Sequence, residues 1–213
     1  MQVAVKREMR ELPDSVCAST DGDVIVVLDL AEDDALRARG VARELTNRFQ
    51  RLRKKARLQP GDTVDLFFAV AAPENGGGGE GGDLQAELAA AVTAEAAYLE
   101  EALGTRPLPD ARRPRGAVVI DEETSTLALP SGTAAALTAR LASPAPAVCA
   151  AAVARDYGDA AARGAEAFVA AHGAPALQTA AAAGGGAVEV RLDGTACKLV
   201  VGTHLFWKAG DVP

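Results

Sequence analysis

Nine basic side chains lie within residues 37–57, and Glu44 is the single acid among them. Six of the nine fall within residues 48–57. Lysine and arginine gathered on one surface neutralise phosphates and release counterions, and arginine can also stack on an unpaired base. The chemistry that this segment could perform is therefore the binding of RNA.

The whole chain of 213 residues is acidic, with a formal net charge of −7. A uniformly acidic surface would disfavour a polyanionic partner, but here the basic charge is concentrated in one segment. Hydrophobic residues make up 49% of the chain and aromatic residues only 4%. A core is therefore possible, but it must be built mainly from valine, leucine and alanine.

A helix is expected to position these cations, over residues 33–57. Apolar residues recur there at helical spacing on one face, and the Pro-Gly pair at 60–61 should stop the helix. The opposite face should offer Arg51, Lys54 and Arg57 to phosphates, with Asn47 and Gln50 as readers of base edges. The full set of candidate RNA-binding residues is Arg43, Asn47, Arg48, Gln50, Arg51, Arg53, Lys54, Lys55 and Arg57.

Other roles for the same residues remain open at this point. A solvated helix face, with cations in its last turn complementing the helix dipole, would account for some of them. Glu44 and Arg48 are four residues apart and could form a pair along the helix. Arg43 could be structural and dock on a neighbouring domain.

The elements around this helix favour an α+β fold, in which a small sheet packs on a long basic amphipathic helix and a second small α+β domain follows. Strands are expected at residues 2–7, 24–28 and 63–70. A βαβ-like unit and a helix laid across an antiparallel sheet both fit this order. Four regions follow: a strand–helix–strand unit (1–72), a glycine-rich linker or loop (73–83), an acidic helix with a Pro/Arg connection (84–114), and an appended α+β domain (115–213).

The appended domain is rich in alanine, so its elements are predicted from weaker patterns. Residues 133–142 favour a helix, and 146–154 fit a strand or a helix. The remaining expected elements are strands at 117–120 and 126–129, helices at 160–171 and 175–183, and a hairpin formed by 188–192 and 197–201.

Other motifs give no catalytic or metal site. The glycine run at 76–82 lacks the Lys-Ser/Thr of a phosphate-binding loop and is interpreted as a linker. His172 and His204 have no plausible partner nearby in sequence, so surface or capping roles are expected. The acids at 121–123 are expected to form a solvated turn, and no nucleophile–base arrangement is found.

The cysteines and the hydropathy pattern indicate a cytosolic protein with no membrane partner. The three cysteines lie far apart, which is typical of reduced thiols. Charged residues interrupt the beginning of the sequence, so no signal peptide is expected, and no apolar run reaches the length of a membrane span.

Residues 40–66 read GVARELTNRFQRLRKKARLQPGDTVDL. This segment resembles a pattern in the tail of isoleucyl-tRNA synthetases, and residues 200–205 resemble the closing strand and turn of the eukaryotic cytosolic forms. The positions that match the pattern are Gly40, Ala42, Arg43, Glu44, Asn47, Arg48, Phe49, Gln50, Arg53, Lys54, Leu58 and Asp62.

The resemblance implies a non-catalytic carboxy-terminal portion of such an enzyme, with residues 1–72 facing the anticodon end of tRNA(Ile). The parent enzyme uses ATP and Mg to join isoleucine to its tRNA, but no cofactor is expected in this chain. The His-x-Gly-His and Lys-Met-Ser-Lys-Ser signatures of the class I catalytic body are both missing. That body would be a partner. The alternative is an assembly module that binds other synthetases.

Overall fold

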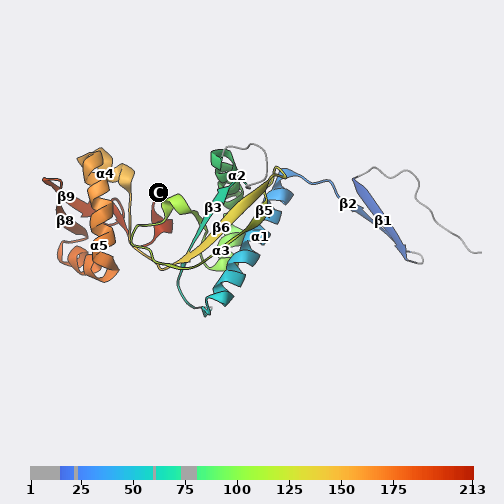
Figure 1. Cartoon of the computed structure of the whole chain (residues 1–213), viewed down its shortest axis with the longest axis horizontal. Coiled ribbons are helices and arrows are strands. Elements are labelled where there is room, and N and C mark those ends of the chain that lie inside the picture. The colour runs from blue at the N-terminus through green and yellow to red at the C-terminus, as the bar shows by residue number, and fades with distance from the viewer. Residues whose placement is uncertain (1–14, 22–23, 60, 73–80) are drawn as a thin grey trace, which may run out of the picture.

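The computed structural model describes residues 15–21, 24–59, 61–72 and 81–213 (Figure 1). The strand expected at 2–7 and most of the expected linker at 73–83 lie outside these residues. Figure 1 shows two compact parts, with a two-stranded hairpin extending away from them. Helices and small sheets alternate through both parts, so the predicted α+β class is confirmed.

Helix α1 (Asp34–Lys55) is the long basic helix expected from the sequence. The side chain of Asp33 caps its N-terminus by accepting a hydrogen bond from the backbone N–H of Leu36 at 2.7 Å. Leu45, Phe49 and Leu52 are fully buried on the predicted apolar face. The 3.6-residue period therefore predicted both the helix and the side that packs into the core.

The end of α1 is set by backbone hydrogen bonds. The N–H of Leu58 donates to the carbonyl of Arg53 at 3.0 Å, and the N–H of Arg57 donates to that of Lys54 at 3.1 Å. This pattern is a Schellman motif, whose left-handed position is usually glycine. Arg57 occupies that position with φ 58°. The chain thus leaves the helix with an arginine held in a conformation that side chains disfavour.

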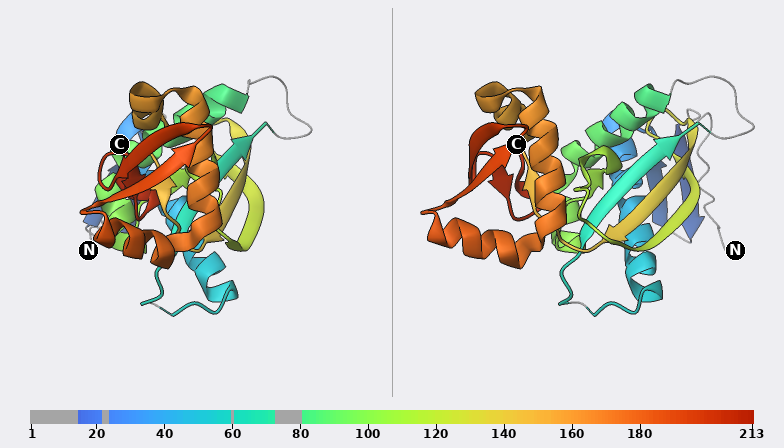
Figure 2. Two further views of the ribbon diagram at one scale, coloured as in Figure 1. Left: turned by 90° about the vertical axis from the view of Figure 1, so that its left-hand side faces the viewer. Right: turned by 60° about the vertical axis from the view of Figure 1, so that its left-hand side comes forward.

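A four-stranded sheet packs against α1. Its strand order is β4 (Leu108–Pro109), β3 (Asp65–Ala71), β6 (Ala134–Ala142), β5 (Val119–Ala128). Only the β3–β4 pair is parallel, and the β3–β6 and β6–β5 pairs are antiparallel. Helices α1, α2 (Gly81–Ala94) and α3 (Ala96–Leu103) share one core with this sheet (Figure 2). Of the two arrangements left open, the structure shows a helix on a mainly antiparallel sheet.

The helix predicted for residues 133–142 is wrong, because this segment forms strand β6. Ala135, Leu137, Ala139 and Leu141 are buried at every second position, which is the period of a strand. Alanine, leucine and arginine favour helices in isolation, but pairing with β3 on one side and β5 on the other overrides that preference.

Strand β5 corrects the expectation of a solvated turn. It runs continuously through the segments expected as separate strands, so residues 121–123 lie in the strand and not in a solvated turn. Strands β5 and β6 pair with each other and, through β6, with β3. Residues from the expected 1–72 unit and from the expected 115–213 domain therefore share one sheet.

The second compact part contains α4 (Ala150–Tyr157), α5 (Asp159–Ala183) and a hairpin of β8 (Ala187–Leu192) and β9 (Thr195–Val200). Helix α5 is kinked at Gly173, whose backbone is non-helical at φ 62° and ψ 161° (Figure 2). The kink separates the two helices expected from the sequence. Short strands β7 (Ala147–Val148) and β10 (Leu205–Phe206) pair beside them.

The hairpin outside both compact parts consists of β1 (Val16–Asp21) and β2 (Val24–Asp29), which pair in antiparallel fashion. None of its side chains with described exposure is buried. Val24 is 61% exposed and Leu28 is 57% exposed. An isolated two-stranded ribbon is marginally stable in water, so this hairpin gains little from the core of the chain.

Candidate RNA-binding surface

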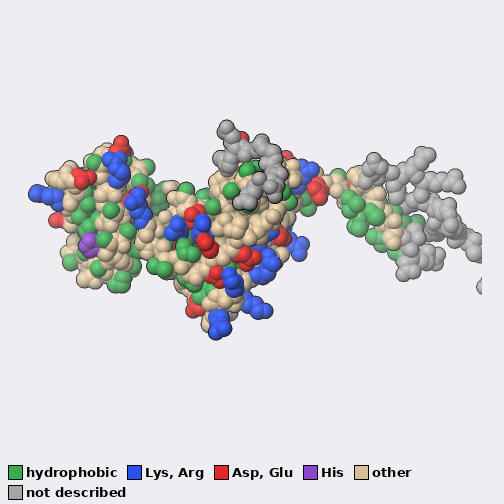
Figure 3. Space-filling model, in the orientation of Figure 1, with side chains coloured by type: hydrophobic (Ala, Val, Ile, Leu, Met, Phe, Trp, Pro, Cys, Tyr) green, Lys and Arg blue, Asp and Glu red, His purple; other side chains and the backbone are tan. Residues whose placement is uncertain are grey.

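One side of α1 carries an exposed row of polar and basic side chains. We call this row the basic face, and it consists of Arg43, Asn47, Gln50, Arg51, Lys54 and Arg57. The first five recur at spacings of three, four and seven residues, which places them on one side of a helix. In Figure 3, lysine and arginine side chains gather on the central part, toward the end of α1 that lies lowest in Figure 1.

The cations of the basic face are not neutralised within the described part of the chain. No acidic side chain described there lies at ion-pairing distance from Arg43, Arg51, Lys54 or Arg57. Arg43 and Lys54 are eleven residues apart, which corresponds to about 16 Å along a helix axis. With respect to the described residues, the face is thus an extended row of uncompensated charge on a rigid element.

Other cations of the same segment are held by neighbouring side chains. Asp121 receives a hydrogen bond from Lys55 at 2.9 Å, and this bond lowers the pKa of the Asp121 carboxyl. Among the described residues, Arg37 also forms ion pairs with Glu32 at 3.4 Å and with Asp34 at 4.0 Å, and Arg39 lies over the Tyr98 ring, 5.8 Å from its centroid.

Arg48 lies on the inner side of α1 and not on the basic face. Its side chain is only 9% exposed, forms the expected pair with Glu44 at 3.1 Å, and donates to the Ser125 hydroxyl at 2.8 Å and to the Thr126 carbonyl. Burial lowers the pKa of Arg48, and the carboxylate of Glu44 opposes that change. Arg48 therefore fastens α1 to β5, and we leave it out of the proposed surface.

Arg53 is partly buried and organises the loop that follows α1. Its Nη2 donates to the carbonyl of Gln59 at 3.1 Å and to that of Asp62 at 3.0 Å. The Asp62 carboxylate accepts the backbone N–H of Gln59 at 2.7 Å, which closes the same loop. Arg53 is therefore a fixed group at the edge of the basic face, in contrast to the exposed Lys54 beside it.

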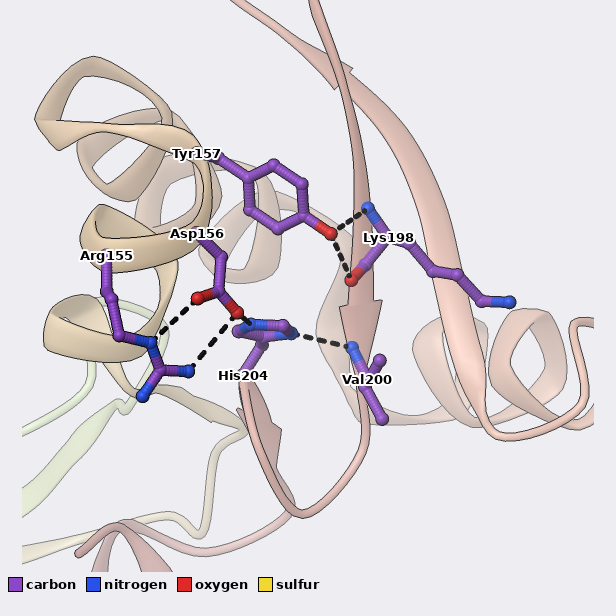
Figure 4. A network of polar contacts seen from close by, with 6 residues as sticks. All are labelled: Arg155, Asp156, Tyr157, Lys198, Val200 and His204. Atoms are coloured by element: carbon purple, nitrogen blue, oxygen red, sulfur yellow. Dashed lines mark hydrogen bonds and ion pairs between the residues drawn. The ribbon is translucent and has the colours of Figure 1, made fainter.

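Sequence reasoning missed a polar network in the second part (Figure 4). His204 is buried, so the surface or capping role expected for it is wrong. Its Nδ1 accepts the N–H of Val200 at 3.2 Å, which leaves Nε2 to donate to the Asp156 carboxylate at 2.9 Å. Hydrogen bonds lower the pKa of Asp156 to about 2, and the bond from Arg155 has a larger effect than the bond from His204.

This network links α4 to the strands of the second part. Asp156 and His204 are 48 residues apart, so no local motif could have paired them. His172, by contrast, is exposed, as expected, and its ring contacts the carbonyl of Phe168 four residues earlier. The network joins structural elements and offers no nucleophile beside a base.

The described ranges contain neither a metal-binding cluster nor a helix that could span a membrane. No group of three or more His, Cys, Asp or Glu side chains there could hold a metal ion. No helix in this part of the chain is both long and apolar enough to cross a membrane.

Comparison with known proteins identifies relatives for part of the chain. Part of this chain is similar to isoleucine–tRNA ligases. It is 34% identical to the cytoplasmic isoleucine–tRNA ligase of Arabidopsis thaliana over 106 residues, which are 50% of this chain and 8% of that protein. It is 49% identical to the Schizosaccharomyces pombe cytoplasmic enzyme over 53 residues, which are 25% of this chain and 5% of the relative.

A probable cytoplasmic isoleucine–tRNA ligase of Dictyostelium discoideum is 50% identical over 50 residues, which are 24% of this chain and 5% of that protein. The matched part is thus less than a tenth of each of these relatives. No protein-family model matches the chain.

Proposed function

We propose that this chain is a non-catalytic, tRNA-binding portion of an isoleucine–tRNA ligase that works in the cytoplasm. In this role it supports the ATP-dependent attachment of isoleucine to tRNA(Ile), which the catalytic body performs. The similarity to three cytoplasmic ligases supports the proposal that the parent protein is an isoleucine–tRNA ligase. The basic face of α1 supports the role in binding tRNA.

The observation that carries this proposal is a row of uncompensated cations on a rigid helix. Arg43, Arg51, Lys54 and Arg57 are exposed and have no acidic partner among the described residues, although the chain as a whole is acidic. A solvated face that only stabilises its own helix gains most from charges in the last turn. Arg43 lies near the middle of α1, where the dipole offers it little.

Charge reversal tests the proposal. In the variant Arg51→Glu, Lys54→Glu and Arg57→Glu, tRNA binding measured on filters at moderate salt should become much weaker, because three attractive charges become repulsive. The three positions are exposed, so the fold should persist, and circular dichroism checks this. An unchanged affinity would refute the proposed role of the basic face.

A matched control applies the same change of net charge elsewhere. Arg163, Arg191 and Lys198 are exposed residues of the second part. Their joint replacement by glutamate should weaken binding far less than the α1 variant does. An equal loss of affinity in both variants would mean that net charge, and not a surface on α1, controls binding.

A second candidate is a protein-assembly module, and the exposed apolar hairpin favours it. Val24, Val26, Val27 and Leu28 are each at least 50% exposed, and large exposed apolar patches often mark protein interfaces. The partner proposed for the hairpin is the body of an isoleucine–tRNA ligase, since the relatives extend far beyond the matched segment. The double variant Val26→Ser, Leu28→Ser should no longer co-purify with the body of the ligase, while its binding of tRNA should be unchanged. If the variant still co-purified with that body, the hairpin would be excluded as the contact.

A further inference from the structure

A hollow lies beside the basic face, between the end of α1 and the end of α3. Its volume is about 550 Å³, and Gln50, Arg53, Lys54, Arg57, Leu58 and Leu103 contribute to its lining. Small-molecule sites usually occupy about 300–1,000 Å³, so the hollow is large enough for one nucleotide. It combines apolar, amide and cationic groups within a few residues of the candidate phosphate contacts.

Arg53 lines one wall of the hollow, and its guanidinium is already fixed. Its two hydrogen bonds to the carbonyls of Gln59 and Asp62 hold it in place. A guanidinium is planar and can stack on the face of an unpaired base. Because this group is ordered before any ligand arrives, stacking on it costs less side-chain entropy than stacking on a mobile arginine.

Apolar and amide groups provide the other contacts that a base requires. Leu103 is buried and Leu58 is half-buried, so the two leucines offer apolar surface to the face of a base. Gln50 is exposed at the same hollow, and its Nε2 donates a hydrogen bond to the carbonyl of Ala102 at 3.5 Å. Its second amide N–H and its carbonyl oxygen remain as a donor and an acceptor for a base edge. The bases of a duplex are stacked on one another, so only an unpaired base could enter.

The mouth of the hollow is cationic. Lys54 and Arg57 line it, both are exposed, and neither has an acidic partner within the described ranges. The Schellman motif fixes the backbone of Arg57 at φ 58°, so the side chain of Arg57 extends from a backbone of defined conformation. A phosphate attached to a nucleotide in the hollow would lie near these two cations.

We infer that this hollow binds one unpaired nucleotide of an RNA strand, with the base against Arg53, Leu58 and Leu103 and its phosphate on Lys54 and Arg57. This inference rests on the proposed function and adds to it a site for a single base. A free mononucleotide shares the same chemistry, and its affinity must therefore be compared with that of a strand.

The test compares Gln50→Ala with Gln178→Ala in the full chain. Both remove an exposed glutamine amide from a helix, but only Gln50 lines the hollow, and Gln178 lies on α5 of the second part. Fluorescence anisotropy measures affinity for a short single-stranded RNA, for the same strand annealed to its complement, and for the strand with abasic sites. Gln50→Ala should weaken single-strand binding about tenfold and leave the other two ligands within about twofold. Gln178→Ala should leave all three within about twofold.

Other outcomes overturn the inference in distinguishable ways. If Gln50→Ala has no effect, or weakens duplex and single strand equally, the hollow does not take a base, although the basic face can still bind phosphates. If adenosine monophosphate binds as tightly as the strand, the site belongs to a free nucleotide. If the charge-reversal variant of α1 also binds all RNA normally, the proposed function fails as well.

Discussion

The salt dependence of RNA binding should report how many cations of α1 contact phosphates. The structure leaves Arg43, Arg51, Lys54 and Arg57 without an acidic partner among the described residues, while Lys55 is paired with Asp121. For single-stranded nucleic acid, the logarithm of the binding constant falls with the logarithm of salt with a slope of about −0.7 per neutralised phosphate. Four contacts therefore predict a slope of about −2.8.

Replacing Arg51 and Lys54 by glutamine removes two of these contacts without adding repulsion. The slope should then fall in magnitude to about −1.4. Between 50 and 200 mM salt, the original chain should lose affinity roughly 50-fold and the variant only about 7-fold. The difference between the two chains is thus largest at low salt, where binding should be measured first.

The assay is anisotropy of a labelled single-stranded RNA, titrated with protein over that range of salt. Arg163→Gln with Arg191→Gln is the matched control, since it removes the same charge from exposed positions of the second part. Its slope should stay close to that of the original chain. An equal fall in both variants, or no change in the α1 variant, would refute the assignment of these cations as phosphate contacts.

Three further predictions concern stability. Arg57→Gly should raise the free energy of unfolding, measured in urea, by roughly 0.5–1 kcal/mol. Glycine adopts the left-handed conformation without strain, and this gain outweighs the greater freedom of glycine in the unfolded chain. A loss of stability would contradict the Schellman assignment. Arg48→Met should lower that free energy by about 1–3 kcal/mol, since it removes the hydrogen bonds that the buried Arg48 donates to Ser125 and Thr126 of β5, whereas the exposed Arg51→Met should change it by less than about 0.5 kcal/mol. The pKa of Asp156 is held near 2, below its ordinary 3.8, so its stabilising effect is present above that ordinary value and is lost as pH falls toward 2; acid titration followed by circular dichroism should show this loss in the original chain and not in Asp156→Asn.

The helix and its two faces could be predicted because they depend on local periodicity. Leu45, Phe49 and Leu52 recur at helical spacing, and any partner that packs on α1 must cover that stripe. The pairing of Glu44 with Arg48 was predictable for the same reason, since four residues bring two side chains together on any helix. The burial of Arg48 was not predictable, because its acceptors come from β5.

Residues 133–142 show how tertiary pairing can reverse a local preference. Their alanine, leucine and arginine content favours a helix, yet they form the central strand β6. Hydrogen bonds to two neighbouring strands and the burial of alternate side chains outweigh propensities of a few tenths of a kcal/mol per residue. The alternation was present in the sequence, but small residues made it hard to recognise.

By itself, the sequence determined the class of fold, the extent of α1 and the segment that concentrates positive charge, because each depends on residues close together in the chain. Only the tertiary structure decided which cations stay exposed. Asp121 engages Lys55, the sheet buries Arg48, and the loop after α1 holds Arg53. The first two of these contacts join residues more than sixty positions apart, and such pairs are fixed by packing, which no local pattern records.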